Sequence, residues 1–261
     1  MTSNPLRPQQ TTPPRGLYRP EFEHDACGVG MICDLNNHKS HALIQDALRI
    51  LVNLTHRGAC GCDETTGDGA GISIQKPHVF LQKAARAAHI ALPEATEYAA
   101  GLVFLPADPD RRRAAREVLV QAAAKQGLSF LGWRKVPINP DAAGDLARLV
   151  MPVIRMAFVG SGRAVGDPTE FERRLYCARK TAENTVRSLP DPDDHLFHIV
   201  SLSSRTLVYK GMLLADQMTG FYPDLTDPDL TSAGHRPSAL QYQHLSILGP
   251  GPAHTLPLPQ R

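Results

Sequence analysis

The stretch HDACGVGMICD, from His24 to Asp34, marks the point where the character of the chain changes. The preceding residues 1–20 are rich in proline, glutamine and threonine and show no apolar period, which is typical of disordered chain. From Cys27 onward, CGVGMICDL predicts a strand whose two glycines allow other backbone to approach closely. Ordered structure is therefore expected to begin near Cys27, behind a leader that adds nothing to the core.

Beyond this strand, leucines at helical spacing predict a helix in HALIQDALRILVNLTHRG, with Gly58 just past its end. Further helices are predicted at 78–89, from about 110 to 126, and at 169–188, and strands at 71–75, 98–106, 128–138 and 153–160. Two β-rich runs, HLFHIVSLS and RTLVYKG, are separated by one serine and predict a hairpin. The order lacks a regular βαβ rhythm and a G-x-G-x-x-G after the first strand, which favours a layered α+β fold.

The composition excludes several classes of protein. The 261 residues carry 28 Lys+Arg against 26 Asp+Glu, so no global field predicts binding to nucleic acid or to a membrane surface. The basic run from Arg111 to Arg113 is interpreted as a solvated helix face. An odd count of 5 cysteines and no signal-peptide pattern predict a reducing, cytoplasmic location. We find no apolar window long enough to cross a membrane.

The position of Cys27 raises two interpretations. At the start of a strand, a cysteine is most simply a small buried hydrophobe. If the chain were cut after Ala26, however, Cys27 would carry a free α-amine, whose reference pKa of about 7.7–8.0 suits it to accept the thiol proton. The nucleophile and its base would then belong to one residue.

A glycine-rich segment, NLTHRGACGCDETTGDGAGI, runs from Asn53 to Ile72. Its glycines would let the backbone turn tightly against a ligand, yet it has neither the G-x-x-x-x-G-K-[ST] motif nor the Rossmann context of a phosphate site. His56, Cys60 and Cys62 form a weak zinc pattern without a second ligand pair, so no metal is expected. By spacing alone, Arg57 is a cation at a helix C-terminus.

Three separated motifs together identify a family. HDACGVGMI, LVNLTHRGACGCDETTGDGAGI and VSLSSRTLVYKGMLLADQMTGFYPDL closely resemble the N-terminal glutamine amidotransferase domain of the glutamate synthase large subunit, from about Leu17 to Ser232. That domain is a class II amidotransferase of the N-terminal nucleophile (Ntn) hydrolase type. The resemblance implies a four-layer αββα sandwich, incomplete at its C-terminal side. It also implies that residues 1–26 are a propeptide, that Cys27 is the nucleophile, and that Arg57 and Gly58 orient the terminal amine.

The same resemblance implies a substrate and partners. Glutamine would be hydrolysed to glutamate and ammonia, and the ammonia delivered to a synthase domain that aminates 2-oxoglutarate. A small reductase subunit or ferredoxin would supply electrons. The FMN and iron–sulfur cluster of the family belong to downstream regions, so no cofactor is expected in this chain. The SLSSRTLVYKGML motif is interpreted as hairpin core that need not touch substrate.

After Ser232 the resemblance stops, so we expect a partial amidotransferase domain at 27–232 and an unrelated, disordered tail at 233–261. The family's Arg-Phe-Ser-Thr-Asn-Thr-Phe-Pro-Ser-Trp stretch is absent, as is its Asn-Gly-Glu segment, which supplies the oxyanion hole. Residues 239–249 can be encoded by codons that, read one base later, spell Arg-Phe-Ser-Thr-Ser-Thr-Phe-Pro-Ser-Trp. A frame change near Ser232 is therefore our hypothesis, and near-background activity is the expectation, because losing even one oxyanion donor costs about 100-fold to 1000-fold in turnover.

Two other functions stay open at the level of sequence. One is a non-catalytic fragment that keeps the family surface. The other is a cysteine hydrolase or peptidase of different specificity, which would need a His/Asn pair around Cys27 without removal of the leader.

Overall fold

The computed structural model describes residues 28–55, 65–162, 166–188, 196–233 and 243–244. Within them, every strand pairs antiparallel with its neighbours, and the order β4-β5-β3-β6 forms the largest sheet. Two smaller sheets pair β2 with β7 and β1 with β8. The strands are β1 Val29–Gly30, β2 Ala70–Gln75, β3 Tyr98–Leu105, β4 Ser129–Lys135, β5 Val153–Gly160, β6 His198–Ile199, β7 Thr206–Gly211 and β8 Gln243–His244. This mixture of helices and antiparallel sheets confirms the predicted α+β class.

The helices of the described residues are α1 His41–Asn53, α2 His78–Ala87, α3 Pro109–Lys125, α4 Asp145–Leu149, α5 Pro168–Arg187 and α6 Gln217–Phe221, with short 3₁₀ turns η3 Pro140–Ala142 and η6 Pro223–Thr226. The four longest, α1, α2, α3 and α5, lie close to where apolar spacing predicts them, whereas the short helices α4 and α6 were not predicted. Three of the α-helices have a side-chain cap at the N-terminus, Ser40 for α1, Asp108 for α3 and Asp167 for α5, and each cap accepts at least one hydrogen bond from a backbone N–H of the first turn. Such caps satisfy donors that a helix start otherwise leaves unpaired.

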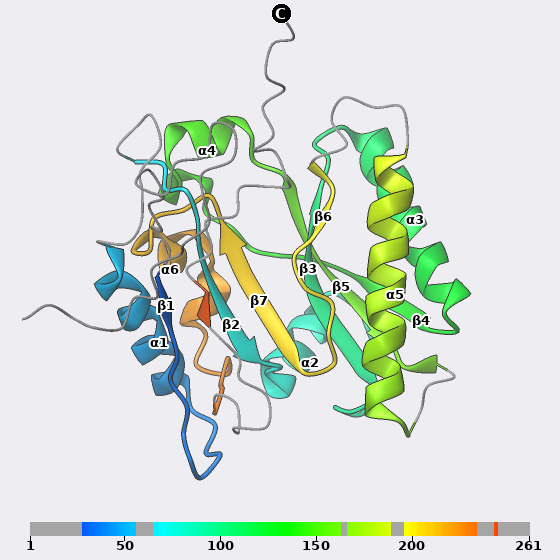
Figure 1. The fold of residues 1–261 in the computed structure, drawn as a ribbon, viewed down its shortest axis with the longest axis horizontal. Helices are drawn as coiled ribbons and strands as arrows, with labels where there is room; N and C mark the ends of the chain where they lie inside the picture. Colours follow the sequence, from blue (N-terminus) through cyan, green and yellow to red (C-terminus); the bar gives the residue numbers. More distant parts are fainter. Residues whose placement is uncertain (1–27, 56–64, 163–165, 189–195, 234–242, 245–261) are drawn as a thin grey trace, which may run out of the picture.

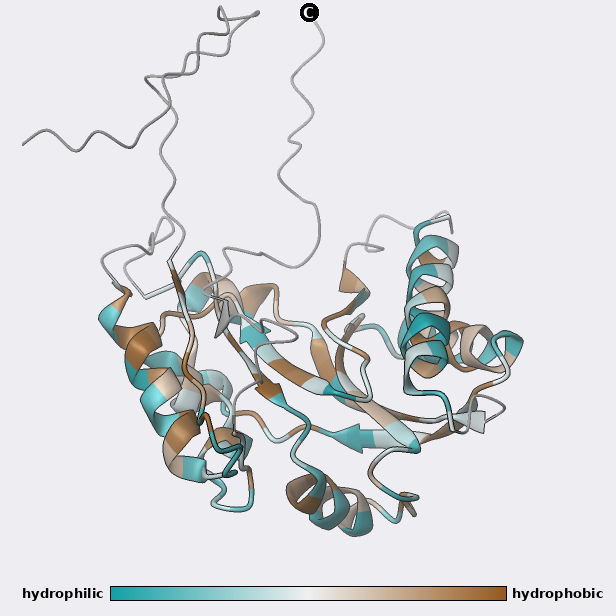
Figure 2. Cartoon of the chain, turned by 60° about the horizontal axis from the view of Figure 1, so that its bottom comes forward, coloured by the Kyte–Doolittle hydropathy of each residue, from teal (hydrophilic) through white to brown (hydrophobic). Residues whose placement is uncertain are grey.

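Strand β3 lies at the centre of the largest sheet and is buried on both faces. Its alternate residues Ala99, Val103 and Leu105 pack with α3 and α5 in one core. The residues between them point to the other side and pack with α1, α2, β2 and β7 in a larger core. Figure 1 shows the same order across the molecule, with α1 on one side and α3 and α5 on the other. The buried residues of α1 and α5 recur at helical spacing, and Figure 2 shows that both helices carry apolar and polar residues.

The predicted hairpin between 195–203 and 205–211 is wrong. Strand β6 pairs with β3, whereas β7 pairs with β2, so the chain passes from one sheet to the other between them. The carboxylate of Glu172 on α5 explains this course, because its Oε1 accepts hydrogen bonds from the Ser203 hydroxyl and from the Ser204 N–H and hydroxyl. Ser203 and Ala100 also exchange backbone bonds, which hold the chain along β3 before it crosses to β2.

Strand β1 is shorter than CGVGMICDL predicts and has an unexpected partner. Val29 lies opposite His244 and Gly30 opposite Gln243, so two residues of the tail add a strand beside β1. No strand period in the tail predicts this pairing.

Candidate active site

The three predicted site residues, Cys27, Arg57 and Gly58, lie outside the described residues, as do Cys60 and Cys62. The described chain on either side of these residues shows the surroundings of the predicted site. Three described segments border it: the start of β1, the end of α1, and residues 65–69.

The start of β1 lies directly against the last turns of α1. A Cβ placed on Gly30 would stand 2.3 Å from Ile50 Cγ2 and 3.6 Å from Leu54 Cδ1, so only glycine permits this approach. Gly28, the residue after Cys27, is buried. The segment that leads to the predicted nucleophile and the helix end that leads to Arg57 therefore leave the described structure close together.

The end of the glycine-rich segment lies against the chain that follows β7. A Cβ on Gly67 would meet the Leu213 carbonyl oxygen at 2.4 Å, and one on Gly144 would meet the Thr65 carbonyl oxygen at 2.4 Å. The Gln217 side chain joins the two segments, since its Nε2 donates to Thr65 O at 2.8 Å and its Oε1 accepts from Leu214 N at 2.9 Å. The glycine-rich segment was predicted to approach a ligand closely. At Gly67 the close approach is instead to the protein's own backbone, at Leu213.

A network of buried polar groups fixes β7 and η6. Arg134 donates through both terminal nitrogens to Asp224, at 2.7 and 2.8 Å, and Tyr209 OH donates to the same carboxylate at 3.0 Å. Burial acts to lower the pKa of Arg134, but the Asp224 carboxylate outweighs it and holds that pKa above its usual value. Because Arg134 lies on β4, this network ties the largest sheet to the β2–β7 sheet.

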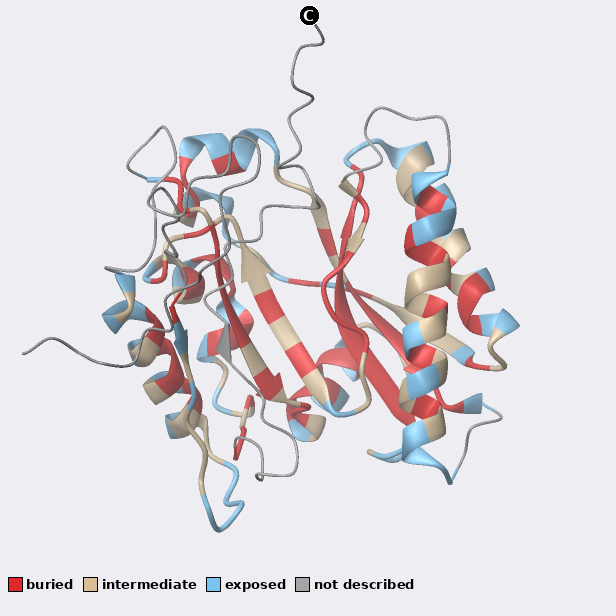
Figure 3. Ribbon diagram, in the orientation of Figure 1, coloured by how far each residue is buried: buried red, intermediate tan, exposed pale blue. Residues whose placement is uncertain are grey.

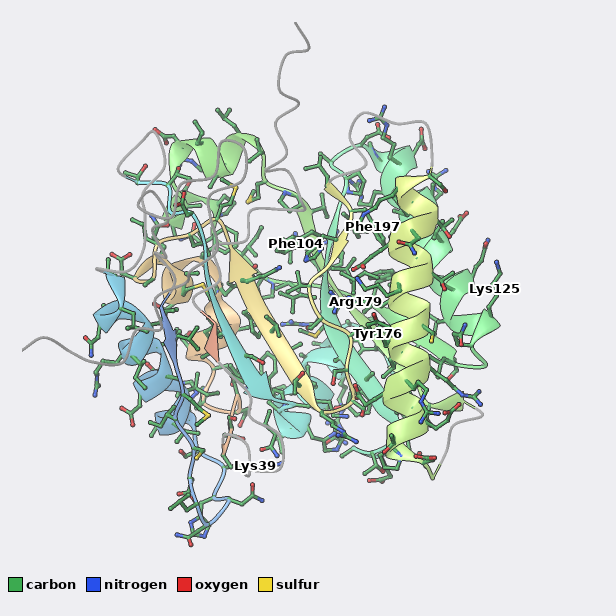
Figure 4. The ribbon with its side chains drawn as sticks, in the orientation of Figure 1. Lys39, Phe104, Lys125, Tyr176, Arg179 and Phe197 are labelled. Atoms are coloured by element: carbon green, nitrogen blue, oxygen red, sulfur yellow. The ribbon has the colours of Figure 1, made fainter. Side chains whose placement is uncertain are left out.

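Sequence reasoning missed two partly buried basic side chains beside this region, Lys210 and His198. Lys210 Nζ lies 3.0 Å from His198 Nε2, which pairs the end of β7 with β6. Burial lowers the pKa of Lys210 to about 8, with Arg179 lowering it further and Glu183 opposing. Burial and then the Lys210 charge lower the pKa of His198 to about 4, so near neutral pH the imidazole is uncharged and its Nε2 accepts a hydrogen bond from the Lys210 ammonium. Figure 4 shows Arg179 on the side of α5 that faces β6. The only signal in the sequence was a lysine inside the apolar run TLVYKG.

Lys210 also lines a small apolar pocket between β3, β5, β7 and α6, with Phe104, Ile154 and Phe221 among its walls. Its volume is about 40 Å³, which holds a few water molecules but not an amino acid. This space is therefore too small to be a glutamine site as it stands.

The residues that the structure describes bring no three His, Cys, Asp or Glu side chains together as metal ligands. His56, Cys60 and Cys62, the weak zinc pattern, fall outside those residues. Likewise, among the described helices none is long and apolar enough to cross a membrane.

Comparison with known proteins defines the class. Residues 27–236 match the family of class-II glutamine amidotransferases, which is most of the chain. The chain therefore belongs to the class-II glutamine amidotransferases. The matched region begins at the cysteine that the sequence singled out.

The relatives narrow the class to one kind of enzyme. Over 84% of its length the chain is 41% identical to the NADPH glutamate synthase large chain of Bacillus subtilis and, over 84%, 36% identical to the NADH glutamate synthase of Schizosaccharomyces pombe. Over 78% it is 40% identical to ferredoxin-dependent glutamate synthase 2 of Arabidopsis thaliana. The predicted resemblance to the amidotransferase domain of glutamate synthase is thus confirmed. The chain spans only 10–14% of the length of these relatives.

Proposed function

We propose that this chain is part of a domain that hydrolyses the side-chain amide of glutamine, with Cys27 as an N-terminal nucleophile exposed by removal of residues 1–26. The 261 residues as written lack the oxyanion-hole segment, so their own activity is proposed to be near background. The observation that carries the proposal is the start of the family match at residue 27, directly after the leader. The burial of Gly28 adds support, because the residue that directly follows Cys27 is packed into the fold.

The chemistry follows from a cysteine at a chain end. The free α-amine accepts the thiol proton, and the Cys27 sulfur attacks the amide carbon of glutamine to form a tetrahedral intermediate. Collapse of this intermediate breaks the C–N bond, the amine returns the proton to the leaving nitrogen, and ammonia departs. Water then attacks the thioester, which releases glutamate and restores the thiol.

Arg57 and Gly58 are proposed to orient that amine, the guanidinium and the glycine carbonyl acting from beside the nucleophile. The contact between Gly30 and the Leu54 side chain supports this assignment. Gly30 follows Cys27 by three residues and Leu54 precedes Arg57 by three residues, so the contact brings the two chain segments together. The wider fold proposal is the four-layer αββα sandwich. Two observations support it. Helices α3 and α5 cover one face of the largest sheet, and on the other side of that sheet α1 packs against β2.

The division of the chain and its setting belong to the same proposal. Residues 1–26 are the propeptide, 27–232 a partial amidotransferase domain, and 233–261 a tail out of frame with the family. The ammonia passes to a synthase region that carries the FMN and the iron–sulfur cluster, with a reductase subunit or ferredoxin as electron donor. The odd cysteine count supports a cytoplasmic location.

Intact mass and a glutaminase assay test the proposal. We expect the mass of a chain that has lost residues 1–26, and glutamate release that the Cys27→Ala variant abolishes. The matched control is the variant Cys33→Ala, which should keep activity. Cys33 is a free and partly buried cysteine three residues after β1. The assay is run on the 261-residue chain and on one extended with the alternative reading frame, where activity should rise from near background. Glutamine hydrolysis by an extended protein that retains its leader would refute the mechanism.

A further inference from the structure

Residues of α3 and of the outer strand β4 line a groove on the opposite side of the largest sheet from β2 and β7. Figure 1 shows α3 and β4 at that side of the molecule. The volume of the groove is about 410 Å³, within the range of small-molecule sites and far above that of the apolar pocket beside Lys210. Its walls are Arg113, Arg116, Glu117, Val120, Gln121, Phe130 and Trp133. None of these residues takes part in the proposed glutaminase chemistry.

The floor of the groove is aromatic. The Phe130 and Trp133 rings are 5.1 Å apart and tilted by 44°, and the Arg116 guanidinium lies 5.3 Å from the centre of the Trp133 ring. The Nε of Arg116 is buried and has no hydrogen-bond partner among the described residues. A buried donor without an acceptor is costly, and because this atom is buried, a ligand in the groove would have to reach the guanidinium through its terminal nitrogens.

Positive charge gathers behind this floor. The pKa of Arg155 on β5 is lowered by burial and then by the nearby charges of Arg112 and Arg116. Arg113 pairs with Asp110, but both side chains are largely exposed, so that pair neutralises little of the local field. The groove thus has a surplus of guanidinium groups next to a flat aromatic surface.

We propose that this groove binds a nucleoside monophosphate. The base would stack on the Trp133 ring, which already contacts the Arg116 guanidinium. The phosphate oxygens would accept hydrogen bonds from the guanidinium groups of Arg116 and Arg113. Glu117 and Gln121 would accept hydrogen bonds from amino groups of the base. The site is formed by α3 and β4 only, so it is short. An extended peptide advances about 3.3 Å per residue and would run beyond it, whereas a single nucleotide would not.

Trp133 makes a direct test possible, because it is the single tryptophan of the chain. AMP is titrated into the full chain while tryptophan emission is followed with red-edge excitation, where adenine does not absorb. We expect saturable quenching, with adenosine and inorganic phosphate each binding at least about tenfold more weakly than AMP, because each offers only half of the contacts. Absence of saturable quenching by AMP, or equal binding of phosphate alone, overturns the proposal.

Variants locate the site. Arg116→Gln should weaken AMP binding about tenfold to a hundredfold, as expected for loss of a charged hydrogen bond. Lys125→Gln is the matched control, since Lys125 lies on the same helix but on its exposed side (Figure 4), and it should bind AMP like the wild type. Trp133→Leu, followed by equilibrium dialysis with labelled AMP, should lose binding to a similar degree. Hexaglutamate serves as an acidic peptide for comparison. If Arg116→Gln binds AMP as the wild type does, or if hexaglutamate binds more tightly than AMP, the proposal of a nucleotide site is overturned.

Discussion

Replacing Asp224 with alanine removes the carboxylate that holds Arg134 and Tyr209 together in the core. The Asp224 side chain is 3% exposed and that of Arg134 is 11% exposed, so water cannot replace the lost partner. Breaking such a buried pair from one side leaves an uncompensated charge and costs about 3–5 kcal/mol. The Tyr209 hydroxyl also loses its acceptor, which adds roughly 1 kcal/mol. The expected loss is therefore a large part of the roughly 5–15 kcal/mol that stabilises a typical domain.

Urea unfolding followed by circular dichroism measures this loss, and two comparisons isolate its cause. Asp145→Ala is the control, because the ion pair of Asp145 with Arg148 is solvent-exposed and should contribute less than about 1 kcal/mol. The triple variant Arg134→Met/Tyr209→Phe/Asp224→Leu removes every polar atom of the network at once, and we expect it to recover most of the stability. If Asp224→Ala unfolds within about 1 kcal/mol of the wild type, the reasoning about this pair is refuted.

Three further perturbations follow from the described contacts. Because the pKa of His198 is about 4 in the folded state, the folded chain binds fewer protons than the unfolded chain between about pH 4 and 6.5. The free energy of unfolding should therefore fall by roughly 2 kcal/mol on acidification through that window, and His198→Gln should flatten this dependence in urea titrations at several pH values. Gly101→Ala should lower the melting temperature sharply, since its Cβ would stand 1.6 Å from the Ser201 carbonyl oxygen, whereas Gly220→Ala, with 3.3 Å to its nearest atom, should have little effect. Asp108→Ala removes the cap of α3 and should cost about 1 kcal/mol in urea unfolding, and a change below a few tenths would contradict the capping role.

The structure also bears on how the proposed active site could be approached experimentally. The roles of Cys27, Arg57 and Gly58 stay predictions, since all three lie outside the described residues. What the described residues contribute is a frame, formed by Gly30 against α1 and by Gly67 against the chain after β7. Enlarging either glycine should disturb glutaminase activity without removing any reactive group, because each contact positions a segment next to the predicted site.

The four longest helices, α1, α2, α3 and α5, and the strands of the largest sheet could be predicted from local pattern, whereas the five-residue helices α4 and α6 could not. In α3 the start is signalled by Asp108 and the end by Gly127, whose φ of +71° suits glycine, and apolar spacing supplies the buried face between them. The cysteine at position 27 likewise stood out from local context, because a leader without apolar period runs directly into a strand with glycines. Such signals lie within a few residues of the feature that they predict.

Contacts between distant parts of the chain could not be predicted in this way. Arg134 and Asp224 are 90 positions apart, and no local pattern pairs them. The partners of β6 and β7 were mistaken because sequence proximity favours a hairpin, whereas Glu172 on α5 directs the chain across to β2. The groove beside Trp133 likewise exists only because α3 folds over β4. Local pattern specifies which face of an element is apolar, but the choice of which faces meet depends on packing across the whole molecule.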